Sequence, residues 1–383
     1  MEIPPPEGRF NPRFERVRRA FEASFSAGEL GAAVAVFLDG EPVVDLWGGH
    51  ADAARTRPWM RDTLVSVAST TKGATALCLH RLADSGSLDL DAPVARWWPE
   101  FAEAGKAELP VRWLLSHRAG LPAIREPLPP EALFDWERMT AALAAERPFW
   151  EPGSRHGYHA ITFGHLVGEV LRRVDGRSLG TFLREEIARP LGLDLHVGVP
   201  EADLARCAEI APVGEAGRAN KLLARMRDRT SLLALAFRNP PRGRAVVNTR
   251  EWRRAEIPAA NGHATARAMA RLYAALARGG ELDGVRVLSA EALERATREE
   301  AFGPDAVLPG LHTRFGQGFM LAHRGLPLGP SPRAFGHPGM GGSIGFADPD
   351  ARIGFGYVTN RMQSGLAGDA RGFALIAALY ASL

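Results

Sequence analysis

The sequence predicts an α+β fold in which both ends of the chain contribute strands to one antiparallel sheet. Residues 31–47 and residues 343–358 each show two β-type runs separated by a short turn. Residues 71–278, between these two hairpins, show mainly helical patterns separated by loops rich in Pro and Gly. Strands at both ends with helices between them are typical of an α+β domain rather than of alternating βαβ units.

The N-terminal part is predicted to hold a helix followed by a hairpin. Asn11 followed by Pro12 indicates a helix start, and apolar residues then fall on one face of the helix until Gly28. Asp39 and Gly40 separate the β-type runs 31–38 and 41–47. An Asp-Gly pair between two such runs is a strong hairpin signal, so the first strand pair is predicted to be antiparallel.

The rest of the chain is predicted to fold back onto this hairpin. Helices are expected at residues 71–83, 162–174, 179–187, 221–237 and 266–278, and a further helix at residues 369–383. Residues 239–262 and 303–335 lack clear periodicity and are expected to be loops that line a substrate site. We therefore expect one domain over residues 10–383, with a sheet lobe from about 10–75 and 260–383 and a helical lobe with cleft loops from about 76–259.

The composition excludes several classes of protein. The 383 residues are 46% hydrophobic and 24% charged, as in ordinary folded domains. The net charge is only +3, and acidic residues are interleaved with the arginines, so no nucleic-acid partner is expected. No apolar stretch is long enough to cross a bilayer, and the start has no signal-peptide pattern, so we expect a cytoplasmic protein without a membrane partner. Cys78 and Cys207 are expected to be free thiols.

Ser69 and Lys72 form a Ser-x-x-Lys motif between a β-type run at residues 63–68 and a helix. Residues three apart in the first turn of a helix lie on one face, so the lysine amine can reach the serine hydroxyl. The lysine is notable because Lys72, Lys106 and Lys221 are the only lysines in a chain with 47 basic residues. Arginine does not deprotonate and cannot serve as a base. The motif therefore predicts a serine nucleophile with a lysine activator.

Tyr158 and a glycine-rich segment at residues 336–342 are two further candidate elements. Tyr158 stands at a loop-to-helix junction, where a hydroxyl can point into a cleft, whereas the other tyrosines lie within helix or strand patterns. The segment holds His337, Gly339 and Met340 just before the second hairpin. Glycines allow close approach of the backbone to a substrate, and the N–H groups of Met340 and Ser69 are predicted to form an oxyanion hole.

These elements, in this order, resemble the serine β-lactamase and penicillin-binding-protein superfamily, most closely its class C-like branch and the family VIII carboxylesterases. Residues 114–121 also resemble the Leu-Leu-x-His-x-x-Gly segment of that superfamily, so the resemblance extends over nearly the whole chain. It implies a serine β-lactamase/DD-peptidase-like fold, with an antiparallel sheet flanked by helices and a mostly helical second lobe. It also implies that Ser69 is the nucleophile, Lys72 its activator and Tyr158 the general base and acid.

The chain departs from the superfamily pattern at two positions. Ala160 stands where the Tyr-x-Asn motif has asparagine, and His337, Pro338 and Gly339 stand where the family has Lys-Thr-Gly. Both changes remove groups that β-lactam enzymes use to hold an antibiotic. The sequence therefore predicts a serine carboxylesterase that cleaves small esters through an acyl-enzyme on Ser69, with no cofactor.

Alternative interpretations remain open at this stage. An amidase or D-aminopeptidase, an acyltransferase, a weak β-lactamase and a silent ligand-binding protein share the same motifs, and the oligomeric state is left open. Ser343 lies in a Gly-x-Ser-x-Gly pattern, but a hairpin follows it and no histidine occurs after His337, as a nucleophile elbow would require. His156, His159 and His165 lack an acidic or cysteine partner at a zinc-binding spacing, so no metal site is expected.

Overall fold

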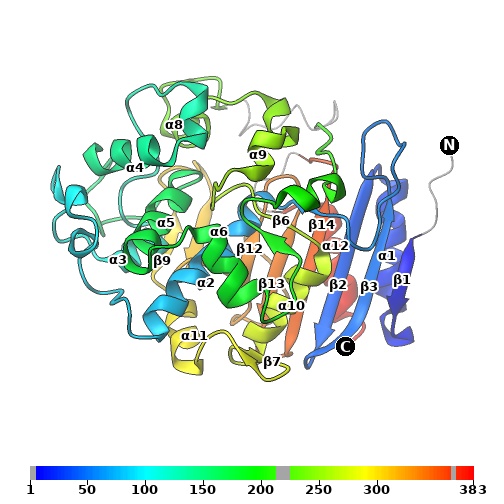
Figure 1. Cartoon of the computed structure of the whole chain (residues 1–383). Coiled ribbons are helices and arrows are strands. Elements are labelled where there is room, and N and C mark those ends of the chain that lie inside the picture. Colours follow the sequence, from blue (N-terminus) through cyan, green and yellow to red (C-terminus); the bar gives the residue numbers. More distant parts are fainter. Residues whose placement is uncertain (1–5, 213–224, 364–367) are drawn as a thin grey trace.

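The structure is a computed structural model that describes residues 6–212, 225–363 and 368–383 (Figure 1). Within this described part, nine antiparallel strands form the main sheet, in the order β1-β3-β2-β14-β13-β12-β11-β10-β9. In that order the strands are β1 (Glu7–Phe10), β3 (Glu41–Gly49), β2 (Gly31–Leu38), β14 (Ile353–Thr359), β13 (Ile344–Asp348), β12 (Phe335–Pro338), β11 (Met320–Leu321), β10 (His312–Phe315) and β9 (Ala301–Pro304). The first and last strands of the chain share one sheet, which confirms the predicted α+β class.

The remaining described strands, each of two residues, form two smaller sheets. The first contains β4 (Val65–Ser66), β6 (His263–Ala264) and β5 (Leu195–His196), and the second pairs β7 (Glu281–Leu282) with β8 (Val285–Arg286). The helices are α1 (Glu15–Ser26), α2 (Thr71–Asp84), α3 (Val111–Leu115), α4 (Trp136–Ala145), α5 (Thr162–Asp175), α6 (Leu179–Phe182), α8 (Leu232–Arg238), α9 (Arg250–Arg254), α10 (Ala266–Ala277), α11 (Ala290–Thr297) and α12 (Ala370–Tyr380). A π-helix (Leu183–Ala188) continues α6.

The main sheet is covered by helices on both faces. Residues 33, 35 and 37 of β2 pack in the core that contains α10, whereas residues 32, 34 and 36 pack with α1 and α12. This alternation explains why β2 is a continuous apolar run. Helix α10 lies so close to β14 that a Cβ atom on Gly354 or Gly356 would be 2.3 Å from the backbone of α10. The two glycines therefore allow this close packing. Figure 1 shows α3, α4 and α5 beside the sheet, on the side away from α1 and β1.

Several local predictions are confirmed. The hairpin turn has φ of +54° at Asp39 and +90° at Gly40, the left-handed geometry that a two-residue turn requires. Asn11 caps a short 3-10 helix (Pro12–Phe14) that leads into α1. Thr265 caps α10 through a hydrogen bond from the N–H of Ala268, and Gly279 follows the helix with φ of +80°.

Other local predictions are wrong. The region 303–335 contains β10, β11 and the end of β9, and the region 239–262 contains α9, so neither is a plain loop, although residues of both regions line pockets as expected. The run at residues 63–68 forms only the two-residue strand β4. The helix predicted over 221–237 lies partly outside the described residues, and α8 begins only at Leu232. Ser231, which caps α8 by accepting the N–H of Ala234, supplies the start signal that the prediction missed.

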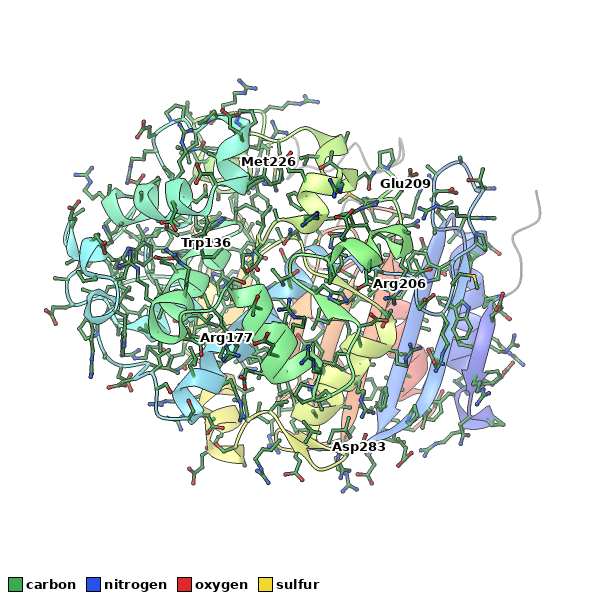
Figure 2. The ribbon with its side chains drawn as sticks, viewed as in Figure 1. Trp136, Arg177, Arg206, Glu209, Met226 and Asp283 are labelled. Atoms are coloured by element: carbon green, nitrogen blue, oxygen red, sulfur yellow. The ribbon has the colours of Figure 1, made fainter. Side chains whose placement is uncertain are left out.

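Surface arginines are paired with nearby carboxylates. Arg177 lies 2.6 Å from Asp175 and also contacts Glu185 and Glu186, while Arg206 lies 2.9 Å from Asp203; both arginines are labelled in Figure 2. These local ion pairs agree with the interleaved charge pattern of the sequence. A search of the described helices finds none that is long and apolar enough to span a membrane.

Candidate active site

The turn that carries Ser69 connects β4 to α2. Val67 follows β4 and donates its N–H to the carbonyl of Gly262, 2.8 Å away, which ties the turn to the segment before β6. Ala68 has φ of +47°, a left-handed conformation that costs a residue with a Cβ roughly 1–3 kcal/mol. A short 3-10 helix (Ala68–Thr70) then leads directly into α2. The strained turn thus presents Ser69 at the start of a helix, as the motif predicts.

Lys72 is completely buried one turn after Ser69. Its Nζ atom lies 3.2 Å from Ser69 Oγ, 2.8 Å from the carbonyl oxygen of Ala160 and 2.9 Å from that of Ala259. Burial, and then the positive charge of Arg242, hold the pKa of Lys72 well below its usual range. The structure therefore brings together the two residues of the motif.

The contacts of Lys72 fit a neutral amine. A neutral amine has two N–H donors and one lone pair, and the two carbonyl oxygens accept both donors. The lone pair is then free to accept the hydroxyl proton of Ser69. Lys106, the other buried lysine that the structure describes, instead has three carbonyl acceptors, from Glu103, Ala144 and Glu146. Only Lys72 has a hydroxyl in place of the third carbonyl.

Tyr158 lies beside this pair. Its side chain is 7% exposed, and the Lys72 Nζ atom lies 4.8 Å from the centre of its ring. Burial raises the pKa of Tyr158, and a hydrogen bond with Ser69 partly opposes that rise. The phenol is therefore protonated near neutral pH and can donate a proton.

Asp305 holds the segment that carries Tyr158, and no sequence pattern predicted this role. Its carboxylate accepts the backbone N–H groups of Tyr158, Val307 and Leu308 at 3.1, 2.8 and 2.9 Å, and the hydroxyl of Thr313 at 2.9 Å. The carboxylate is 147 residues away from Tyr158 in the chain. Such a long-range contact leaves no local pattern that could predict it.

His337 lies on β12, next to Tyr158. Its ring centre is 6.1 Å from that of Tyr158, and its Nδ1 atom lies 2.7 Å from the carbonyl oxygen of Pro338. A carbonyl only accepts, so Nδ1 carries the proton, and Nε2 has no partner within the described residues. Burial, followed by the charge of Lys72, lowers the pKa of His337 to about 3. The imidazole is therefore neutral and cannot replace the charge of a lysine at this position.

Gly339 and Met340 lie in the turn between β12 and β13. The N–H of Gly339 donates to the carbonyl of Ser343 at 2.7 Å and is not available to a substrate. A Cβ atom at Gly339 would lie 2.4 Å from the carbonyl oxygen of Val67, so the glycine allows this turn to pack against the Ser69 turn. The N–H groups of Met340 and Ser69 find no acceptor in the part of the chain that the structure describes. They are the two donors that the sequence predicts.

Arg371, on α12, supports the same turn from behind, although sequence reasoning did not identify it. Its guanidinium donates to the carbonyl of Gly341 at 3.0 Å and to that of Arg361 at 2.9 Å, and it pairs with the buried carboxylate of Glu29 at 2.6 Å. The Glu29 carboxylate also accepts the hydroxyl of Tyr357 at 2.7 Å. This buried network holds the Met340 turn on the sheet.

Ser343 and the histidines near Tyr158 have structural contacts. The Ser343 hydroxyl donates to the carbonyl of Val67 at 2.8 Å, and β13 rather than a helix follows it. His159 accepts the N–H of Leu121 and contacts the carbonyl of Gly157, and His156 contacts Thr313. Within the described ranges, no group of three His, Cys, Asp or Glu side chains could hold a metal ion.

Two pockets meet at Ser69. The smaller has a volume of about 70 Å³ and the larger about 500 Å³. Ser69, Phe237 and Met340 line both pockets. Tyr158 and His337 line only the larger one, whereas Ala160 lines only the smaller one. A bound carbonyl at Ser69 would therefore have its two substituents in pockets of different size and chemistry.

A buried lysine that can take the proton of a neighbouring serine, beside two free backbone N–H groups, is an arrangement suited to serine-dependent acyl transfer. Comparison with known proteins agrees with this class. The family model described as Beta-lactamase matches residues 17–379, nearly the whole chain. The chain therefore belongs to the beta-lactamase family.

Individual relatives are similar along most of their length. The chain is 43% identical to "Esterase/beta-lactamase LipL" of Mycobacterium tuberculosis over 94% of this chain and 84% of that protein. A crystal structure of a family VIII carboxylesterase matches with a TM-score of 0.91 and 46% identity, covering 100% of both chains. A penicillin-binding protein homologue from Caulobacter crescentus matches with a TM-score of 0.89 and 44% identity over 99% of this chain and 100% of that one. These matches confirm the predicted superfamily and fold.

Proposed function

We propose that the chain is a serine carboxylesterase that hydrolyses small esters through an acyl-enzyme on Ser69. The observation that carries this proposal is the placement of the Lys72 amine, with its two N–H groups bound to carbonyl oxygens and its third position directed to Ser69 Oγ at 3.2 Å. The relatives described as esterase or carboxylesterase, at 43% and 46% identity, support ester hydrolysis as the reaction.

The proposed acylation step uses three side chains. Lys72 accepts the proton of the Ser69 hydroxyl as the oxygen attacks the ester carbonyl, and the N–H groups of Ser69 and Met340 bind the oxyanion. The protonated Tyr158 phenol then donates its proton to the leaving alkoxide and recovers a proton from Lys72. Water attacks the acyl-enzyme in the second step, and its proton passes through the Tyr158 hydroxyl to Lys72. The bond between the acyl carbon and Ser69 Oγ then breaks, Lys72 returns the proton to Ser69 Oγ, and the free acid leaves.

Turnover is expected to fall as the pH is lowered through the pKa of Lys72, because only the unprotonated amine can accept a proton. This limb should lie far below the pH at which an ordinary lysine titrates, since burial and Arg242 lower the pKa. Arg242→Gln removes the second cause and is expected to shift the limb to higher pH. The kcat/KM for p-nitrophenyl butyrate, measured against pH for both proteins, checks this. If the limb does not move in Arg242→Gln, the group that titrates there is not Lys72.

Short esters are expected to be better substrates than β-lactams. A β-lactam offers an amide and a carboxylate, and each needs a polar partner once water leaves the cleft. Ala160 offers no side-chain partner, and the neutral His337 lacks the positive charge that a lysine would bring. We expect kcat/KM for p-nitrophenyl acetate or butyrate to exceed that for penicillins and cephalosporins at least about a hundredfold, the scale of two lost polar contacts.

Parallel assays with one cephalosporin and one D-aminoacyl anilide test this expectation against the alternatives. Equal or faster turnover of the cephalosporin would favour β-lactam hydrolysis, which the double name of the Mycobacterium tuberculosis relative makes the second candidate. Faster turnover of the anilide would favour an amidase. A cytoplasmic location and the absence of a nucleic-acid partner stay predictions from the sequence.

A further inference from the structure

The two pockets at Ser69 can be assigned to the two halves of an ester. Tyr158, which donates a proton to the leaving alkoxide in the proposed mechanism, lines the larger pocket and not the smaller one. The alcohol half must therefore lie in the larger pocket. The acyl chain, on the other side of the carbonyl carbon, then enters the smaller pocket, whose volume of about 70 Å³ suits a short chain.

Two unpaired hydrogen-bond donors belong to side chains that line this smaller pocket. Arg242 is partly buried, but its Nη1 atom is fully shielded from solvent and has no hydrogen-bond partner among the described residues. Trp252 is only 2% exposed, and its indole N–H likewise has no acceptor there. Guanidinium and indole N–H groups can donate but not accept. Buried donors without partners are costly, so an acceptor from the ligand is expected to satisfy them.

The charge of the pocket points to an anion. Arg242 is the only charged residue in the described lining, which otherwise consists of apolar side chains, small hydroxyls and glycine. The nearby charge that acts on it, that of Arg238, is of the same sign. Burial and Arg238 lower the pKa of Arg242 to about 10, so its guanidinium remains charged near neutral pH. A partly buried cation without a counter-ion among the described residues is stabilised by a carboxylate, which a guanidinium binds through two parallel hydrogen bonds.

We propose that the smaller pocket binds a short acyl chain that ends in a carboxylate held by Arg242, so that the preferred substrates are half-esters of short dicarboxylic acids. The proposal rests on the proposed esterase function and specifies its substrate class. Phe302, Leu308, Leu311 and Leu326 make much of the lining of the larger pocket apolar, and its one arginine, Arg324, is exposed to solvent. We therefore expect the preferred alcohol half to be apolar, because a solvent-exposed arginine holds a carboxylate less strongly than a shielded one does.

Benzyl esters with matched acyl chains test this assignment. Monobenzyl glutarate and benzyl pentanoate have acyl chains of equal carbon number and the same alcohol, and they differ only in the terminal carboxylate. The purified wild-type protein is expected to hydrolyse monobenzyl glutarate with a kcat/KM at least about tenfold higher, measured by release of benzyl alcohol. The pair of esters 4-carboxybenzyl pentanoate and benzyl pentanoate, with the carboxylate on the alcohol half, should show no such preference.

Variants identify the group that recognises the carboxylate. Arg242→Gln is expected to lower the glutarate-to-pentanoate ratio at least about tenfold, and Trp252→Phe, which removes the indole N–H together with part of the ring system, about two- to tenfold. Arg238→Gln is the matched control, since this exposed arginine lies four residues earlier and lines neither pocket. Its ratio should stay within about twofold of wild type. The ratio is the readout because a change in the pKa of Lys72 affects both esters alike.

Three results would overturn the proposal: a wild-type ratio of one or below, a ratio that Arg242→Gln leaves unchanged, or a preference for the 4-carboxybenzyl ester. Calorimetry with glutarate alone distinguishes failure of the anion site from failure of the proposed esterase function. If no ester is hydrolysed but glutarate binds the wild type and binds Arg242→Gln at least about tenfold more weakly, the anion site stands and the reaction is wrong. If glutarate binds both proteins equally or neither, the site itself is wrong.

Discussion

Ser69→Ala is expected to reduce ester hydrolysis below detection, a loss of at least about four orders of magnitude in kcat. The loss is this large because the acyl-enzyme cannot form and the remaining groups supply only binding and oxyanion stabilisation. Alanine is a good helix former, and the partly exposed Ser69 side chain contributes little to packing, so the variant should fold normally. Steady-state hydrolysis of p-nitrophenyl butyrate, with circular dichroism as a check on folding, measures the effect.

Ser343→Ala is the matched control for this variant. Ser343 is the serine of the competing Gly-x-Ser-x-Gly pattern, and its hydroxyl is already bonded to the carbonyl of Val67. Its removal should leave most of the activity and cost about 1 kcal/mol of stability, the scale of one hydrogen bond. If instead Ser343→Ala lost the activity and Ser69→Ala kept it, the roles assigned to the two serines would be reversed.

Lys72→Arg is expected to lower kcat by at least about two orders of magnitude although the positive charge is kept. A guanidinium does not lose its proton at the pH of the reaction, so it cannot accept the proton of Ser69. It also cannot reproduce the contacts of a compact amine with Ser69 Oγ and the carbonyls of Ala160 and Ala259. Single-turnover hydrolysis at several pH values measures the acylation rate directly.

Lys106→Arg separates a chemical effect from the cost of placing arginine in a buried lysine site. Lys106 is completely buried and bonded to three carbonyls, as a structural lysine would be. Its replacement should lower the stability while the kcat of the folded fraction stays close to wild type. Near-normal acylation by Lys72→Arg would mean that the lysine serves only as an electrostatic anchor for Ser69.

The sequence predicted the parts of the fold that local signals define. The hairpin at Asp39 and Gly40, the cap at Thr265 and the hairpin at residues 344–359 depend on residues close together in the chain, and the structure has all three. Strands β10 and β11 were missed because they have only four and two residues, too few to show a period. Helices α4 and α11 were also missed, although Asp135 and Ser289 cap them in the usual way.

The residues of the candidate site also separate into those that local sequence patterns predicted and those that they did not. Ser69 and Lys72 are one helical turn apart, so their meeting follows from helix geometry alone. Tyr158 was found because of its place at a loop-to-helix junction, although its approach to Ser69 depends on how the helices pack. No local sequence pattern predicted the roles of Arg242, Asp305 and Arg371, because segments that are distant in the chain supply their partners or their pocket. Arg371, for example, reaches Glu29 across 342 residues of chain.

The measurement that tests the central claim most directly is the location of the covalent adduct. A fluorophosphonate reacts with an activated serine, and trypsin separates the two candidates, since Ser69 lies in the peptide of residues 62–72 and Ser343 in that of residues 334–352. The account predicts one adduct per chain, on Ser69, and its loss in Ser69→Ala but not in Ser343→Ala. An adduct on the peptide of residues 334–352, or no adduct on an enzyme that hydrolyses esters, would contradict it.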